Sequence, residues 1–124
     1  MNKPCPPATQ DVLVNLRNRR KAIEGANYGP ADPRQANVKY WRERAAEWGV
    51  TPAEARMMRC GNCAAFGVSP HELACIRQGL ASEGVDGYDS IVKAELGYCR
   101  AFKFKCAASR TCSAWIVGGP SRQS

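Results

Sequence analysis

Histidines, phosphate-binding loops and long apolar runs are scarce or absent in this sequence. The chain has one histidine, His71, and no glycine-rich phosphate loop, Ser-His-Asp set or paired-carboxylate pattern, so it is predicted not to be an enzyme. No segment approaches the roughly 18 consecutive apolar residues of a membrane span, and no apolar signal-peptide segment follows Lys3. A heptad repeat is also lacking, which argues against a coiled coil.

Cysteine, by contrast, is abundant, with seven residues in a chain of 124, a length that corresponds to one domain. Such a chain buries a modest core, which a covalent or metal staple would stabilise. The odd number of cysteines and the lack of a signal peptide favour a metal site over a disulfide framework. Cys5 lies in a proline-rich segment and is expected to be a free thiol without a role.

Helix-capping and proline signals divide the chain into parts of one compact domain. We expect a disordered tail at residues 1–10, a helical part at 11–50, a cysteine-rich part at 51–118 and a second tail at 119–124. The expected fold class is small α+β, mostly α with a short C-terminal hairpin, in which a metal cluster staples an irregular cysteine-rich region.

Apolar residues at helical spacing predict two helices in the N-terminal part. The first begins after the cap Asp11 and is expected to bury Val12, Leu16 and Ile23. The second is expected to start at Asp32-Pro33, with Trp41 and Trp48 as core anchors.

Two capping boxes, Thr51-Pro-Ala-Glu54 and Ser69-Pro-His-Glu72, predict short helices on either side of the Cys60 to Cys63 loop. A further short helix is expected at residues 89–96. Alternation over residues 98–106 and a return over 111–117 predict the hairpin. His71 would lie in the first turn of its helix, an exposed position that does not favour it as a metal ligand.

Six cysteines form the candidate metal site. The knuckle Cys60-Gly-Asn-Cys63 suits zinc, an iron-sulfur cluster or a redox dithiol. No second C-x2-C or C-x2-H follows, and separate single cysteines suit a cluster better than a zinc ribbon. Aromatic residues near these cysteines are expected to shield the cofactor from water: Phe66, Tyr98, Phe102 and Trp115. The other cysteines are Cys75, Cys99, Cys106 and Cys112.

The motifs Cys60-Gly-Asn-Cys63-Ala-Ala-Phe66, Gly97-Tyr-Cys99 and Cys112-Ser-Ala-Trp115-Ile resemble the ligand loops of high-potential iron-sulfur proteins (HiPIPs). The resemblance implies one [4Fe-4S] cluster held by four cysteines. The preferred ligand set is Cys60, Cys63, Cys99 and Cys112. A second arrangement uses Cys75 instead of Cys112, and a Cys75–Cys106 disulfide is left open. Zinc is the alternative metal.

Over nearly the whole chain, the sequence also resembles small tailed-bacteriophage proteins described as HiPIP-like. The shared segments include Asn27-Tyr-Gly-Pro30, the knuckle and Arg110-Thr-Cys112-Ser-Ala-Trp115. This resemblance implies a virion-associated structural or accessory protein, a capsid decoration or a head or tail component. Its partners would be other virion proteins, and its location the virion, with the host cytoplasm during assembly.

Two other functions remain open at this point. One is a soluble electron carrier of the HiPIP type. The other is a zinc-stapled nucleic-acid-binding module, which the net charge of +7 raises as a hypothesis. It would use the basic residues at 17–21 together with Lys103, Lys105 and Arg110. A solvated helix face also explains the cluster at 17–21. No membrane partner is expected.

Overall fold

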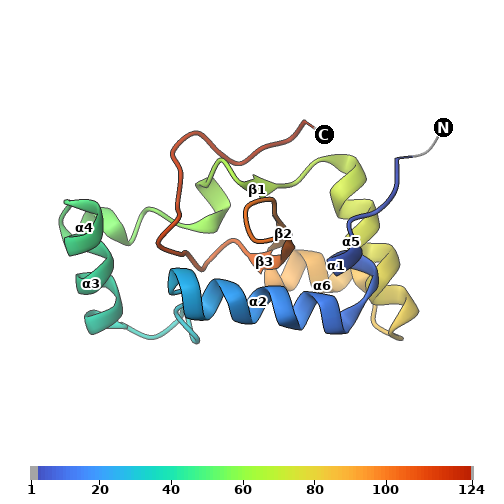
Figure 1. Ribbon diagram of the computed structural model, residues 1–124, viewed down its shortest axis with the longest axis horizontal. Coiled ribbons are helices and arrows are strands. Elements are labelled where there is room, and N and C mark those ends of the chain that lie inside the picture. The colour runs from blue at the N-terminus through green and yellow to red at the C-terminus, as the bar shows by residue number, and fades with distance from the viewer. Residues whose placement is uncertain (1–2, 124) are drawn as a thin grey trace.

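The computed structural model describes residues 3–123, which form a small α+β fold of helices around a three-stranded antiparallel sheet (Figure 1). The helices are α1 (Pro7–Gln10), α2 (Val12–Ala26), α3 (Val38–Trp48), α4 (Pro52–Ala55), the 3-10 helix η1 (Cys60–Asn62), α5 (Pro70–Ser82) and α6 (Gly87–Ala94). The strands are β1 (Phe66–Gly67), β2 (Leu96–Cys99) and β3 (Phe104–Ala107). Within residues 3–123, no helix has the length and apolar character needed to cross a membrane.

The helices lie along the sheet and at both ends of it. Figure 1 shows α2 running along the molecule beneath the strands, with α3 and α4 at one end, α5 at the other and α6 nearer the middle, close to the strands. α2 packs on β3, and α5 and α6 pack on β2. The sheet therefore lies between the two helical ends, where loops from both sides reach it.

Local capping signals determine where three of the helices begin. The Asp11 carboxylate accepts hydrogen bonds from the N–H groups of Leu13 and Val14 at the start of α2. Both predicted capping boxes are present, at Thr51 before α4 and at Ser69 before α5. These predictions are confirmed because each depends only on residues within one turn.

The start of α3 differs from the prediction. Asp32 caps a turn instead of a helix, because its carboxylate accepts the N–H of Arg34 at 3.1 Å and its carbonyl accepts the N–H of Gln35 at 3.2 Å. α3 begins six residues later, at Val38. Trp41 is 2% exposed and anchors a core cluster with Ala45 and Ala55, as expected of a core tryptophan.

The buried face of α2 was predicted wrongly. Val12 is 44%, Leu16 50% and Ile23 39% exposed, whereas Asn15 and Ala22 face the core. Asn15 Oδ1 accepts the backbone N–H of Lys105 in β3 at 2.7 Å, and the small Ala22 lets the helix approach closely. A hydrogen bond to a strand thus outweighs the apolar pattern.

The hairpin lies earlier in the chain than predicted. β2 pairs with β3 through Cys99 and Phe104, and β1 adds to the other edge of β2 through Phe66. Residues 111–117 form no strand; Thr111 makes an isolated bridge with Gly29 instead. The chain can turn directly after Cys99 because Lys103 takes a positive φ of 59°.

Residues 3–10 and 119–123 pack on the fold instead of forming tails, and the rest of the two expected tails, residues 1, 2 and 124, lies outside the described part of the chain. Ala8 and Thr9 are buried, and α1 packs on α5 so closely that a Cβ on Gly79 would lie 1.6 Å from the carbonyl oxygen of Thr9. At the other end, Ser121 bonds to β1, because its N–H donates to Phe66 O and its carbonyl accepts from Val68. Both segments have backbone partners that composition alone does not reveal.

Candidate metal centre

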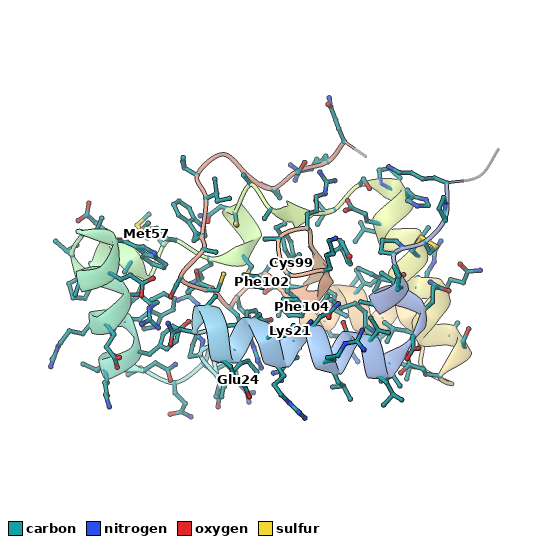
Figure 2. The ribbon with its side chains drawn as sticks, in the orientation of Figure 1. Lys21, Glu24, Met57, Cys99, Phe102 and Phe104 are labelled. Atoms are coloured by element: carbon teal, nitrogen blue, oxygen red, sulfur yellow. A yellow bond between two sulfur atoms is a disulfide. The ribbon has the colours of Figure 1, made fainter. Side chains whose placement is uncertain are left out.

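Five free thiols surround one apolar cavity between η1, the hairpin and the C-terminal loop. The lining residues are Cys60, Cys63, Ala65, Phe66, Cys99, Ala101, Cys106, Cys112 and Ala114. Three of the thiols are almost completely buried, and Cys99 and Cys112 are partly exposed. In Figure 2, Cys99 lies with Phe102 and Phe104 in the middle of the molecule, next to α2. The preferred four ligands are therefore together, with Cys106 as a fifth sulfur.

The Cys60 to Cys63 knuckle is fixed by backbone hydrogen bonds to distant loops. The N–H of Cys60 donates to Arg110 O at 2.6 Å, and that of Gly61 donates to Ala108 O at 3.0 Å. On the other side, the N–H of Ala64 donates to Ile116 O at 2.8 Å. A Cβ on Gly61 would lie 3.0 Å from that of Ala108, so the close approach favours glycine.

Asn62 and Trp115 hold the C-terminal loop against this knuckle. The indole Nε1–H of Trp115 lies 3.0 Å from both Arg59 O and Asn62 Oδ1. The Asn62 side chain also accepts the N–H of Arg59 and donates to Met57 O. The loop that carries Cys112 is thereby locked to the loop that carries Cys60 and Cys63.

Backbone N–H groups point at the sulfurs. The N–H of Phe102 donates to Cys99 Sγ, and the N–H of Ile116 donates to Cys63 Sγ, each at 3.4 Å. Hydrogen bonds of this kind stabilise negative charge on sulfur, and in iron-sulfur sites they help set the reduction potential. The cavity therefore supplies both thiols and donors to their sulfurs.

The cavity thiols differ in pKa. A hydrogen bond with Cys106 lowers the pKa of Cys99 from 9.0 to about 6, with help from the N–H groups of residues 101–103 and against the effect of burial. Burial raises the pKa of Cys112 to about 12 and that of Cys106 well above its ordinary value. Cys99 is thus ready to act as a thiolate, whereas Cys106 keeps its proton.

The spacing of the thiols bears on the choice between a single zinc ion and a cluster. Four thiolates about 2.3 Å from one zinc ion lie only about 4 Å from one another. Among the described residues, the one group of three potential ligand atoms within 4.8 Å of one another is Cys5, His71 and Cys75. No three cavity sulfurs are that close, which suits ligands spread over the irons of a cluster.

The predicted aromatic residues do not all lie at the cavity. Phe66 lines it, and Phe102 and Trp115 pack against the same core cluster. Tyr98 does not, because neighbouring residues of a strand point to opposite faces and it packs instead with Ala8 and Ile76. Tyr98 therefore lies away from the cavity at which the cofactor was expected.

Two residues of the cavity region were missed at the level of sequence. Cys106 was left unassigned, although the alternation of Phe104, Lys105 and Cys106 places Phe104 and Cys106 on the buried face of β3. Tyr28 follows the αL residue Asn27 after α2 and packs edge-on against Phe104 at 4.9 Å. Its hydroxyl accepts the N–H of Ala107, and no local pattern reveals this contact.

The structure places Cys75 outside the cavity and corrects the role of Cys5. These two cysteines form a disulfide with a Cα–Cα distance of 5.6 Å. Cys5 is therefore not a free thiol, and a Cys75–Cys106 bond is ruled out because Cys106 is free. The expectation failed because α1 folds back onto α5 and brings residues 70 positions apart into contact.

Part of the predicted basic set makes contacts within the protein. Lys105 pairs with Glu83 at 3.8 Å, and Arg110 donates to Ala31 O at 3.0 Å. Arg19 lies over the ring of Tyr28. These contacts engage part of the set predicted for nucleic acid, so the geometry gives that function little support.

No protein-family model, curated protein or solved structure matches the chain. The candidate metal centre therefore rests on the residues and geometry of this protein.

Proposed function

We propose that the protein binds a [4Fe-4S] cluster through Cys60, Cys63, Cys99 and Cys112, and that the cluster stabilises its fold. The observation that carries the proposal is the set of five free thiols around one apolar cavity, with N–H donors directed at two of the sulfurs. Spacing too wide for one zinc ion supports a cluster over the zinc alternative.

The four proposed ligands come from three separate segments of chain. Cys60 begins η1 and Cys63 directly follows it, Cys99 ends β2, and Cys112 lies in the irregular C-terminal loop. The sheet between them is small, since β1 has two residues and β2 and β3 have four each. Metal–thiolate bonds across these segments would supply stability that so small a sheet does not, because binding free energy becomes folding free energy.

Iron and acid-labile sulfide analysis of protein purified without oxygen tests the proposal. We expect about four irons and four sulfides per chain and absorbance near 400 nm, as for a [4Fe-4S] cluster. Cys63→Ser should abolish the cluster, whereas Cys5→Ser, outside the cavity, should retain it. A colourless wild-type protein, or one that holds a single zinc ion, would refute the cluster.

For the whole protein, we propose a structural or accessory role in a bacteriophage particle. The support is the resemblance of the sequence to virion-associated phage proteins, together with a metal site suited to stabilising a small fold. Quantification of the chain in purified particles tests this role. A fixed copy number per particle is expected, and absence from washed particles would overturn it.

Electron transfer is a second candidate, favoured by the exposure of one cavity wall. Ala101 and Ala114 line the cavity and are themselves exposed, so only small side chains separate this side from solvent. A bound cluster would supply one-electron redox chemistry, and the chain would hold it within reach of a partner. A reversible potential in the physiological range would support this function, and irreversible loss of iron on oxidation and reduction would exclude it.

A further inference from the structure

A second group of metal-binding side chains lies outside the cysteine cavity, where the N-terminal segment crosses α5. The potential ligand atoms of Cys5, His71 and Cys75 all lie within 4.8 Å of one another. His71 precedes Cys75 by one turn of α5, and its Nδ1 and Nε2 are 3.9 and 3.6 Å from Cys75 Sγ. Cys5 and Cys75 are joined in a disulfide, so their sulfurs are not free to bind a metal in this state.

We propose that reduction of this disulfide converts the group into a Zn²⁺ site formed by Cys5, His71 and Cys75. Two thiolates and one imidazole are typical zinc ligands, and water would complete the tetrahedron. The site would then hold the N-terminal segment on α5 under reducing conditions, as the disulfide does under oxidising conditions. It is independent of the proposed iron-sulfur cluster.

The conversion balances with a dithiol as reductant. The dithiol gives two electrons and two protons to the S–S bond and becomes a disulfide itself, leaving Cys5 and Cys75 as thiols. Zinc binding then releases those two protons, because thiolate is the form that binds metal. Oxidation to the disulfide removes both sulfur ligands, so the site and the disulfide exclude each other.

Contacts that do not depend on the disulfide keep the three side chains close after reduction. Gln10 Nε2 donates to Cys75 O at 2.9 Å, and Thr9 packs on Gly79 of α5 at backbone contact. His71 Nε2 lies 3.2 Å from Pro4 O. An Nε2–H donated to that carbonyl would leave Nδ1 free to bind zinc, the usual arrangement of a metal-bound histidine.

The group is open to incoming metal. Cys75 is buried, whereas Cys5 and His71 are half-buried at a surface hollow lined also by Lys3, Ala74 and Gln78. The other charged side chains near His71, which line a hollow next to it, are Glu72 and Arg100. These two pair with each other at 2.7 Å.

The single histidine of the chain gives a site-specific measurement. Full-length protein labelled with ¹⁵N-histidine shows one imidazole by NMR. It would be recorded oxidised, and again after a water-soluble phosphine has reduced the disulfide, each with an excess of zinc chloride. The phosphine takes oxygen from water and contributes no thiol of its own.

In the oxidised protein, zinc should leave the imidazole resonances unchanged. In the reduced protein, zinc should shift the Nδ1 resonance of His71, because this ring nitrogen becomes a zinc ligand. Imidazole resonances that do not respond to zinc in the reduced protein overturn the proposal, as does an equal response in the oxidised protein.

Two variants separate this site from the cavity thiols. In Cys5→Ser, the zinc concentration needed to shift the His71 resonances should rise by more than about tenfold. Loss of a direct ligand should weaken zinc binding at least as much as loss of a side chain that only hydrogen-bonds to a ligand. Cys106→Ser, which removes a cavity thiol, should leave the response unchanged. If only the cavity thiols bind zinc, His71 will not respond in any of these proteins, and the proposal fails whether or not iron is bound.

Discussion

The guanidinium of Arg100 donates two hydrogen bonds to the carboxylate of Glu72, from Nε at 2.8 Å and from Nη2 at 2.7 Å. Arg100 directly follows Cys99, and Glu72 lies in the first turn of α5. Arg100 also donates to Ser121 Oγ and Gln123 O. One side chain thus ties the hairpin turn to a helix start and to the C-terminal segment.

Glu72→Gln should lower the free energy of unfolding by about 2 kcal/mol at pH 7, because it removes a paired charge in a mostly buried site. Burial raises the pKa of Glu72, but hydrogen bonds from Arg100 and Ser69 outweigh it and hold the pKa below its ordinary 4.5. The Glu72 carboxylate therefore contributes its full stabilisation above pH 4.5, the pKa of the unfolded state. The stabilisation is lost as the pH falls through the lower pKa of Glu72 in the folded protein.

Urea unfolding at pH 7 and at successively lower pH measures this effect. The stability difference between wild type and Glu72→Gln should shrink below pH 4.5. Glu24→Gln, on the exposed side of α2, should cost little at either pH. A difference that stays constant down to pH 2 would contradict the assignment of the acid dependence to Glu72.

Gly79→Ala should destabilise the protein by about 1–3 kcal/mol, because overpacking against backbone forces elements apart. The new Cβ would lie 1.6 Å from the carbonyl oxygen of Thr9, so α1 must move off α5. Gly25→Ala is the matched control, since Gly25 lies in α2 with nothing within 4 Å of its Cβ position. It should gain up to about 1 kcal/mol. Equal urea midpoints for the two variants would argue against the close α1–α5 contact.

Trp115→Phe should loosen the C-terminal loop, because phenylalanine keeps the packing but loses the bonds to Arg59 O and Asn62 Oδ1. We expect a loss of about 1–2 kcal/mol, the cost of leaving such acceptors without their donor. Thermal unfolding followed by circular dichroism measures it. Trp48→Phe should cost less, since its Nε1 donates one longer bond, 3.4 Å to Ser113 O. An identical melting temperature for Trp115→Phe and wild type would show that the indole bonds do not matter.

The variants Cys112→Ser and Cys106→Ser test whether Cys112 or Cys106 is the fourth ligand of the proposed cluster. If Cys112 is a ligand, its serine variant should hold much less iron than wild type after gel filtration. Cys106 is the most deeply buried of the five free thiols, at 2% exposed, and is not one of the four proposed ligands. Its serine variant should therefore keep about four irons per chain, as expected for a complete cluster. The reverse result would make Cys106 the fourth ligand.

Local signals in the sequence predicted local structure well. The caps at Asp11, Thr51 and Ser69 were readable because donor and acceptor lie within one turn. Trp41 was predicted as a core residue from size and helical spacing. The resemblance to high-potential iron-sulfur proteins singled out the knuckle and the two later cysteines, and the structure brings all four to one cavity.

Long-range partners could not be read in the same way. Leu16 fits a buried helical stripe, yet Asn15 faces the core because its side chain accepts a strand N–H 90 residues away. Cys5 was predicted to be a free thiol because no residue near it in the sequence indicates that α1 packs on α5. Tyr98 was assigned to the cavity from its neighbour Cys99, although the two side chains leave β2 on opposite faces.

The Cys5–Cys75 disulfide makes residues 5–75 a covalent ring, with η1 inside it and the hairpin and C-terminal loop outside it. A protease that cuts once inside the ring, for example in the turn before α3, leaves both fragments attached. The cut chain therefore behaves as a single covalent species, and its two fragments separate only when the disulfide is reduced. A cut between Cys75 and Cys99 instead leaves the piece that carries Cys99, Cys106 and Cys112 with no covalent bond to the rest of the chain.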